Sequence, residues 1–123
     1  MLKMKTPIIK YNDKFLNRIS LLMKVGGITI WPFVILRSKY KNAVVTSAVV
    51  IKTHESIHIK QQEELLVLPF YVLYLLEWLL KLPKYGKNAY YNISFEREAY
   101  SNERKKNYLK NRKRYSWINR IFR

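Results

Sequence analysis

The stretch that decides the fold runs from His54 to Leu79 and reads HESIHIKQQEELLVLPFYVLYLLEWL. Its first five residues contain both histidines of the chain, four positions apart, with Glu55 directly after the first. Residues four apart share one face of a helix, so two imidazoles placed in this way can bind one metal ion. Glu55 then lies beside the metal, where it can take a proton from a water molecule. This HExxH spacing predicts a zinc-dependent hydrolase.

A long helix is predicted to carry this motif. We expect it to cover about residues 48–82, with Thr46 or Ser47 as its N-cap. Pro69 should kink or break it, and Pro83 should end it. The sequence therefore predicts one long zinc helix with a bend beyond the motif.

The residues before this helix predict two smaller elements. Apolar side chains at helical spacing predict a helix over residues 11–24, which Gly26-Gly27 can end. Residues 28–37 are rich in Ile, Val and aromatic side chains and predict a strand. Pro32 lacks an amide donor, so we expect an edge strand or a bulge there. Residues 43–45 are a candidate for a second short strand.

The residues after the loop at 84–88 predict a second helix over about 92–112, with Asn92 or Ser94 as its cap. The tail, residues 117–122, is a candidate for a last apolar turn. The expected fold class is mainly α (α+β), with a long zinc helix, a glutamate helix and a small strand element. We expect a single domain over 1–123: a basic N-terminal helix (1–27), a catalytic core (28–112) and a basic C-terminal tail (113–123).

A catalytic zinc ion usually has three protein ligands and one open position, so the two histidines need a partner. The downstream candidates are Glu63, Glu64, Glu77, Glu96, Glu98 and Glu103. On an unbroken helix, Glu64 lies about 9 Å along the axis from His58 and about 15 Å from His54, too far to reach the same ion. Glu63 fails for similar reasons, and Glu77 is further still.

The second helix is therefore expected to supply the third ligand. Glu96 and Glu98 point about 200° apart on a helix, so one of them can face the zinc helix. Ile93, Ala99 and Tyr100 lie within about 60° of the Glu96 direction. Glu98 points away from this apolar face. Glu96 is the better candidate, and Tyr100 can support it or a bound substrate.

The two motifs together resemble those of the gluzincin clan of zinc metallopeptidases, in which a glutamate on a later helix follows HExxH. Residues 96–100, EREAY, look like the signature that carries the third ligand in several gluzincin branches. More closely, residues 54–79 and residues 89–103, AYYNISFEREAYSNE, resemble a family of small metallopeptidase-like proteins of Bacteroidetes and their phages. This resemblance covers about residues 28–115.

The resemblance implies specific roles. It implies His54, His58 and Glu96 as ligands of Zn2+ and Glu55 as general base and acid in peptide-bond hydrolysis. It also implies that the strand over 28–37 pairs with an extended peptide or protein substrate. The chain departs from the best-known gluzincins because Phe95 precedes Glu96, Tyr100 replaces an acid, and no further histidine exists for an oxyanion. The candidates for that last role are Tyr90, Tyr91 and Tyr100.

The charge of the chain is strongly positive and unevenly distributed. The formal net charge is +16, and residues 1–42 and 101–123 each carry nine Lys/Arg and one acid. Residues 43–100 carry six of each. Basic ends can bind an anionic membrane or nucleic acid, or can simply keep the protein soluble. The alternative function is therefore a non-catalytic basic protein, associated with membrane, nucleic acid or a virion, whose zinc site is structural or degenerate.

The apolar run Leu65–Leu82 contains one acid and one base. Such a helix is buried in a core, in contact with a membrane, or part of a homodimer interface, and the sequence leaves all three open. The N-terminus does not read as a signal peptide, because Lys3, Lys5 and Lys10 interrupt any apolar run. We expect a cytoplasmic protein that can associate with a membrane.

Overall fold

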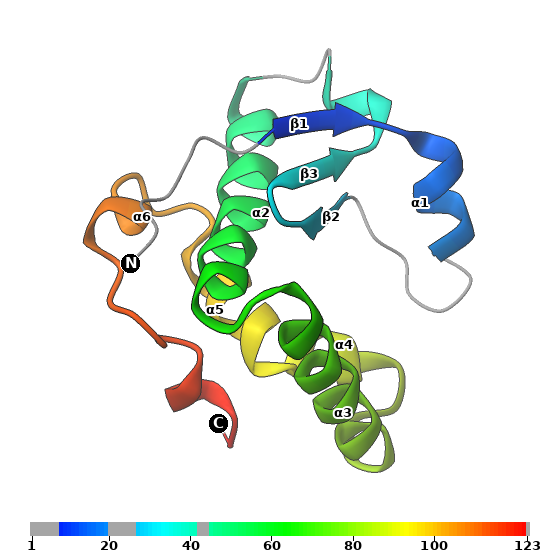
Figure 1. Cartoon of the computed structure of the whole chain (residues 1–123), viewed down its shortest axis with the longest axis vertical. Coiled ribbons are helices and arrows are strands. Elements are labelled where there is room, and N and C mark those ends of the chain that lie inside the picture. The colour runs from blue at the N-terminus through cyan, green and yellow to red at the C-terminus, as the bar shows by residue number, and fades with distance from the viewer. Residues whose placement is uncertain (1–7, 20–26, 42–44, 123) are drawn as a thin grey trace.

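The computed structural model of the chain describes residues 8–19, 27–41 and 45–122. The fold is mainly helical with one small sheet, which confirms the predicted fold class. A central helix, α2, contacts the sheet on one side and α3, α5 and α6 on its other sides (Figure 1). The helices are α1 (Asp13–Ile19), α2 (Val45–Leu65), α3 (Val67–Tyr85), α4 (Ala89–Asn92), α5 (Ser94–Asn102) and α6 (Tyr108–Asn111), with 3-10 turns at Ser38–Tyr40, Gly86–Asn88 and Ile118–Arg120.

The sheet has three strands, β1 (Ile8–Tyr11), β2 (Gly27–Ile30) and β3 (Phe33–Leu36), in the order β1-β3-β2. β3 pairs parallel with β1 and antiparallel with β2. The prediction of one strand over 28–37 is wrong, because the chain reverses at Trp31-Pro32 and the two halves pair with each other. Proline has no amide hydrogen to donate to a sheet, which suits a turn better than a strand. β2 lies at the edge of the sheet, as expected for this segment.

The predicted N-terminal helix over 11–24, within a helical segment 1–27, begins later in the structure, and residues 1–7 and 20–26 lie outside the described part. α1 covers Asp13–Ile19, and its start is fixed by Asn12, whose Oδ1 accepts a hydrogen bond from Phe15 N at 3.0 Å. The residues just before it form β1 instead, paired with β3. Gly27 begins β2 rather than ending a helix, and Gly26 lies outside the described residues.

The predicted long helix breaks earlier than expected. Leu66 has φ 69° and ψ 162°, outside the helical region, and α2 and α3 meet there at a bend of 110°. Pro69 lies in the first turn of α3, where no amide donor is needed, so it neither kinks nor breaks the helix. Pro83 lies inside α3 rather than at its end.

The start of α2 also differs from the sequence prediction. Val45 is helical, so the predicted strand over 43–45 is wrong at that residue, and residues 43 and 44 lie outside the described part. Thr46 and Ser47 lie within the helix and are not its caps.

The predicted second helix over 92–112 is divided into α4, α5 and α6. Ile93 is extended, with φ −63° and ψ 134°, which separates α4 from α5. Neither Asn92 nor Ser94 caps α5 with its own side chain. Glu77 of α3 does so instead, accepting hydrogen bonds from Ser94 N at 2.7 Å and Ser94 Oγ at 2.6 Å. A carboxylate at the N-terminus of a helix satisfies its free amides and dipole.

Two groups of buried side chains flank the middle of α2. Beside the sheet, Val34 and Leu36 pack with Ile59. On the side of α2 that faces α3 and α5 is a larger group, which includes a residue of the predicted apolar tail turn: Phe70, Tyr74, Ile93, Phe95 and Trp117. Within α3, all of which is described, Phe70 and Tyr74 are the buried residues. Core burial of Leu65–Leu82, one of the three expectations, therefore fails for most of that segment.

By length and composition, no single helix among the described residues is long and apolar enough to cross a membrane. The bent pair of α2 and the helices after it, Ser47–Leu65 and Val67–Asn92, passes that test only when the two parts are taken together.

The backbone at Leu66 gives a test of the break between α2 and α3. A positive φ with extended ψ is strained for leucine and natural for glycine, and the Leu66 side chain is 66% exposed. Leu66→Gly should therefore raise the free energy of unfolding, by about 1 kcal/mol, in urea titrations. Leu76→Gly, at an exposed position inside α3, should lower it by about 1 kcal/mol. Destabilisation by both substitutions would contradict the strained geometry.

Candidate metal centre

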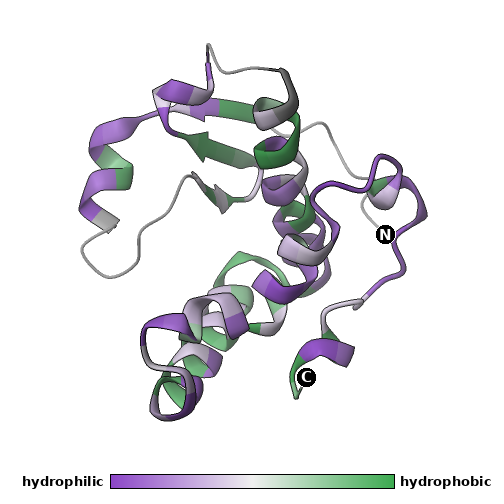
Figure 2. Ribbon diagram, turned by 180° about the vertical axis from the view of Figure 1, so that it is seen from behind, coloured by the Kyte–Doolittle hydropathy of each residue, from purple (hydrophilic) through white to green (hydrophobic). Residues whose placement is uncertain are grey.

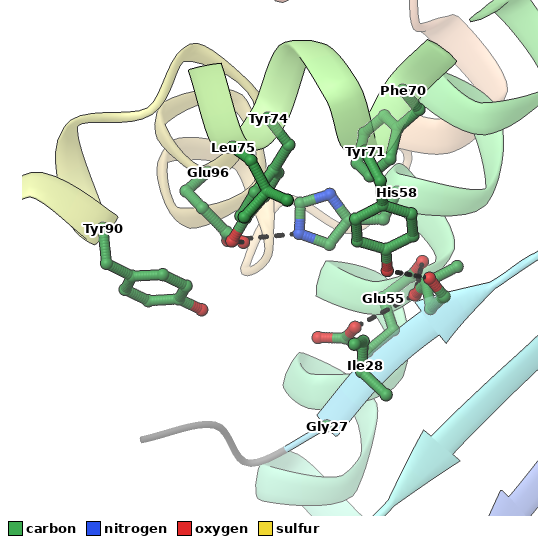
Figure 3. Close-up of a pocket in the computed structure, with 11 residues that line it drawn as sticks. Gly27, Ile28, Glu55, His58, Phe70, Tyr71, Tyr74, Leu75, Tyr90 and Glu96 are labelled. Atoms are coloured by element: carbon green, nitrogen blue, oxygen red, sulfur yellow. Dashed lines mark hydrogen bonds and ion pairs between the residues drawn. The ribbon is translucent and has the colours of Figure 1, made fainter. Parts of the chain in front are cut away.

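The predicted ligands meet at one point between α2 and α5. His54 Nε2 lies 3.0 Å and His58 Nε2 lies 3.1 Å from the same Glu96 oxygen, Oε1. One ligand atom from each residue lies within 4.8 Å of the others, and all three side chains are buried. The close-up in Figure 3 shows His58 and Glu96 on facing helices, joined by the dashed contact. The structure thus brings together the three residues that the sequence proposed.

Each imidazole has an acceptor on its outer nitrogen. His54 Nδ1 lies 2.7 Å from Glu103 Oε2, and His58 Nδ1 lies 2.7 Å from Gln61 Oε1. A carboxylate or amide oxygen can only accept, so both Nδ1 atoms donate and both Nε2 atoms face Glu96. Known metal sites orient their histidines in this way. Glu103 was a candidate third ligand, and it lies on the outer nitrogen instead.

The centre favours a positive charge. Burial acts to lower the pKa of His54, but its hydrogen bonds to Glu103 and Glu96 outweigh burial and raise the pKa to about 10. The pKa of His58 is also raised, because the attraction of Glu96 outweighs burial. Three carboxylates around two buried imidazoles attract protons when no metal is bound. A divalent cation can take the place of those protons, so the donor set fits Zn2+.

Glu96 is held as an anion by side chains from two helices. Burial acts to raise its pKa, but His58 and His54 outweigh burial and bring the pKa well below the usual range. Its second oxygen, Oε2, accepts a hydrogen bond from Tyr74 Oη of α3 at 2.5 Å. Tyr74 thus orients the carboxylate and leaves Oε1 directed at the histidines.

A second layer of polar side chains supports His58 from behind. Gln61 Nε2 donates to Glu98 Oε1 at 3.0 Å, and Arg112 Nη2 donates to the same oxygen at 3.0 Å. Arg112 also binds both oxygens of Glu64, at 2.9 and 3.1 Å. The side chains of Glu98, Arg112 and Glu64 are 0%, 3% and 5% exposed. The sequence prediction placed Glu98 on the side of the helix away from the apolar face of Glu96. In the structure that side of α5 is also buried, because Arg112 of the C-terminal segment covers it.

Glu55 lies beside the metal ligands and contacts the sheet. Its Oε1 accepts a hydrogen bond from Thr29 Oγ1 of β2 at 3.0 Å, and its Oε2 lies 3.8 Å from His54 Nε2. Burial raises the pKa of Glu55 above its ordinary value, although the two histidines oppose the shift. A carboxylate with a raised pKa is a better proton acceptor near neutral pH than an ordinary one.

A cavity of about 170 Å³ adjoins Glu55, His58 and Glu96. Figure 3 shows it between α3 and β2, with the carboxyl groups of Glu55 and Glu96 facing it. Most of its remaining wall is apolar or aromatic, formed by Gly27, Ile28, Thr29, Phe70, Tyr71, Tyr74, Leu75 and Tyr90. A small apolar space with two carboxylates at one end can hold an apolar side chain next to reacting groups.

The three tyrosines proposed for an oxyanion occupy different places. Tyr90 lines the cavity, and burial raises its pKa far above the ordinary value, so it remains a hydrogen-bond donor. Tyr100 packs its ring 4.3 Å from that of His54, with its hydroxyl 3.2 Å from that of Tyr90. Tyr91 is 54% exposed and packs against Tyr100. Of the three, Tyr90 alone is part of the cavity wall.

The backbone of β2 is already hydrogen-bonded on the side that faces α2 and α3. Thr29 O accepts from Gln62 Nε2 at 2.7 Å and also from the Tyr71 hydroxyl, and Gln62 Oε1 accepts from Trp31 N at 2.7 Å. These contacts occupy groups that a peptide strand would need. The predicted pairing of an extended peptide with this strand would therefore require these contacts at Thr29 and Trp31 to break.

The sequence prediction missed Thr29, Gln61, Gln62 and Tyr74. Gln61 had a local signal, since it lies three residues after His58 on the same helical face. Tyr74 follows Phe70 by four residues, which marks one buried stripe of α3. Nothing local to Thr29 or Gln62 indicates that β2 crosses α2 at this point.

No family model, curated protein or solved structure matches the chain. The metal centre is therefore inferred from the atoms of the site themselves. The decisive feature is the pair of histidines with oriented outer nitrogens facing a shared carboxylate.

The buried Arg112 gives a prediction about stability and pH. Arg112→Met should lower the free energy of unfolding at pH 7 by about 3 kcal/mol, because two buried carboxylates lose their counterion. In the wild-type protein burial acts to raise the pKa of Glu98, but Arg112 outweighs burial and lowers it. The contribution of ionised Glu98 to stability is therefore complete above the pKa that Glu98 has in the unfolded protein. It is lost as the pH falls through the lower pKa that Glu98 has in the folded protein.

In Arg112→Met, Arg112 no longer opposes burial, so we expect the pKa of Glu98 to rise. The pH dependence of the contribution of Glu98 to stability should then reverse. The deficit of Arg112→Met relative to wild type should then shrink between pH 7 and pH 4.5 in urea titrations. Arg104→Met, at an exposed position, is the control and should follow the wild type at both pH values. If the free energy of unfolding fell equally for wild type and Arg112→Met between pH 7 and pH 4.5, the role of this ion pair would be contradicted.

Proposed function

We propose that the protein is a zinc-dependent peptidase of a minimal gluzincin type, with His54, His58 and Glu96 as zinc ligands. The observation that carries the proposal is the convergence of His54 Nε2, His58 Nε2 and Glu96 Oε1 on one point beside a cavity. Two histidines and one carboxylate are a ligand set typical of catalytic zinc, which keeps an open coordination position. The cavity supplies the space for that position.

Bound zinc would supply Lewis-acid polarisation of a carbonyl group and would lower the pKa of a water molecule. Glu55 is the general base in this proposal, since its carboxyl faces the cavity and its pKa is raised by burial. Thr29 Oγ1 holds one oxygen of Glu55 and so fixes the direction of the other. After accepting a proton from water, Glu55 gives it to the leaving amine as general acid.

Tyr90 is the candidate to stabilise negative charge on the substrate oxygen. Its hydroxyl stays protonated and it lies across the cavity from Glu55 (Figure 3). Tyr71 and Tyr74 also line the cavity, but their hydroxyls already donate to Thr29 O and Glu96 Oε2. They serve as positioning residues for the strand and for the ligand.

The competing function is a basic protein whose zinc site is purely structural. A structural zinc site is normally closed, with four protein ligands and no need of a base. A buried glutamate beside a cavity and outside the ligand set favours catalysis. The two functions predict different effects of a substitution at Glu55 alone.

The zinc content of purified protein tests the ligand set. Wild-type protein should contain about one zinc ion per chain by elemental analysis, and Glu96→Ala should lose it. Glu63→Gln is the matched control, because Glu63 lies on α2 but binds Trp31 Nε1 at 3.2 Å, away from the centre. It should keep its zinc. Glu98→Ala is unsuitable as a control, since Glu98 supports Gln61 and Arg112.

Folded wild-type protein without zinc would contradict the metal centre. Zinc retained in Glu96→Ala would contradict the third ligand while leaving the two histidines in place. Circular dichroism of each variant establishes that the comparison is between folded proteins.

Glu55→Gln separates catalysis from zinc binding. The substitution keeps the size of the side chain and an oxygen that accepts from Thr29, so zinc content should not change. The kcat for peptide hydrolysis should fall by about 10²- to 10⁴-fold, measured on a library of fluorogenic peptides. Hydrolysis unchanged from wild type would overturn the role of Glu55, and zinc binding without hydrolysis in wild type would favour the structural site.

A further inference from the structure

The outer side of α3 is an exposed apolar face. Eight Leu and Val side chains at its start and along its length are between 39% and 75% exposed: Leu66, Leu68, Val72, Leu73, Leu75, Leu76, Leu79 and Leu80. Pro69 and Pro83 of the same helix are also exposed. At about 100° per residue, these two prolines and the exposed Leu and Val residues within α3 cover roughly half of the helix circumference. We call these ten residues the α3 face.

The charged residues of α3 lie away from the centre of this face. Glu77 and Lys81 form an ion pair at 2.6 Å on the inner side, where Glu77 also caps α5. Lys84 is exposed at the border of the face, and Lys87 is exposed just beyond the helix. α3 extends from the end of α2 away from the sheet (Figure 1), and parts of its ribbon are green, with pale and purple stretches between them (Figure 2). An apolar half-cylinder with lysines at its border is typical of a helix that lies in a membrane surface.

The distribution of acidic groups makes the exterior of the protein positive. The chain has eight Asp and Glu residues against 24 Lys and Arg. All eight carboxylates accept hydrogen bonds from other residues of the protein: Asp13, Glu55, Glu63, Glu64, Glu77, Glu96, Glu98 and Glu103. So few acids cannot neutralise three times as many basic side chains, and the surface therefore attracts anions.

We propose that the α3 face lies in the surface of an anionic lipid bilayer, with the helix parallel to the membrane plane. The apolar half-cylinder supplies burial in the acyl region, and the charge of +16 supplies attraction to anionic headgroups. The other apolar partner available, a second copy of the chain, carries the same +16 charge and is repelled. A helix–helix contact also covers a narrower stripe than half a circumference.

The α3 face borders the cavity at the metal centre. Leu75 is 47% exposed and also lines the cavity, while Tyr71 and Tyr74 on the inner side of the same helix form its wall. If the proposed function holds, the substrate is a peptide segment at the membrane surface. Docking of the α3 face does not itself depend on zinc or on hydrolysis.

Binding to lipid vesicles tests the proposal. The full-length protein should co-sediment with vesicles of equal parts phosphatidylglycerol and phosphatidylcholine, and far less with phosphatidylcholine alone. Leu76→Glu with Leu79→Glu places two charges in the middle of the α3 face and should weaken binding at least about tenfold. The matched control is Val49→Glu with Ile118→Glu, two residues that are 53% and 48% exposed elsewhere. This control variant has the same net charge as Leu76→Glu/Leu79→Glu and should bind vesicles as wild type does.

Each other result overturns the proposal. Absence of binding by wild type excludes an anionic membrane as the partner. Equal binding by both double variants assigns the interaction to the basic ends and not to α3. A wild-type dimer in sedimentation that dissociates in Leu76→Glu/Leu79→Glu, without vesicle binding, assigns the face to a second copy.

A second measurement does not require a charge inside the face. The chain has no cysteine, so Leu76→Cys and Val49→Cys each give one site for a polarity-sensitive fluorophore. Anionic vesicles should shift the emission at position 76 to the blue and leave that at position 49 unchanged. Equal shifts at both positions, or none, would overturn insertion of α3. Because neither position is a zinc ligand or lines the cavity, failure here is distinct from failure of the metal centre.

Discussion

The buried carboxylate of Glu96 is the interaction on which the arrangement of the helices depends. A carboxylate this deeply buried is costly unless several donors surround it. Here the donors come from two other helices, His54 and His58 of α2 and Tyr74 of α3. Moving α5 by one residue along α2 would remove these donors together. The charge therefore fixes the relative position of three helices, in addition to forming a site.

His54 fixes the same position a second time. Its two ring nitrogens contact Glu96 and Glu103, which lie seven residues apart, at the start of α5 and just beyond its end. Two turns of helix separate these residues, so α5 must run alongside the imidazole. Gln61 of α2 adds a further link to α5, because its Nε2 donates hydrogen bonds to Phe95 O and Glu98 Oε1. Polar contacts of this kind specify one arrangement, whereas apolar contacts between helices tolerate several.

The sequence predicted those parts of the site that depend on local spacing. The positions of His54, Glu55 and His58 follow from helical periodicity, and Glu96 followed from the face it shares with Ala99. Glu98 was wrongly placed because its surroundings are set by Arg112 and Glu64, and Arg112 and Glu64 lie 48 residues apart in the sequence. Helical geometry tells which residues share a face but not what covers the opposite face.

The fold was harder to predict where one residue decides the path of the chain. A leucine carries no turn propensity, so the break at Leu66 had no sequence signal, while Pro69 nearby gave a misleading one. β1 is a strand because β3 lies beside it, which no window around residues 8–11 can reveal. The fold class was predictable because residues 45–85, which form α2 and α3, contain no glycine and have proline only at positions 69 and 83.

The break at Leu66 also decides what the two sides of α3 do. A bend of 110° turns α3 across the end of α2, so Phe70 and Tyr74 on its inner side meet the centre. A straight helix would have carried these side chains away from His58, and the cavity would have lost most of its aromatic wall. The same bend leaves the outer side of α3 exposed within the described part of the chain. The cavity and the exposed apolar face are thus consequences of one backbone turn, and whatever covers the face also borders the cavity through Leu75.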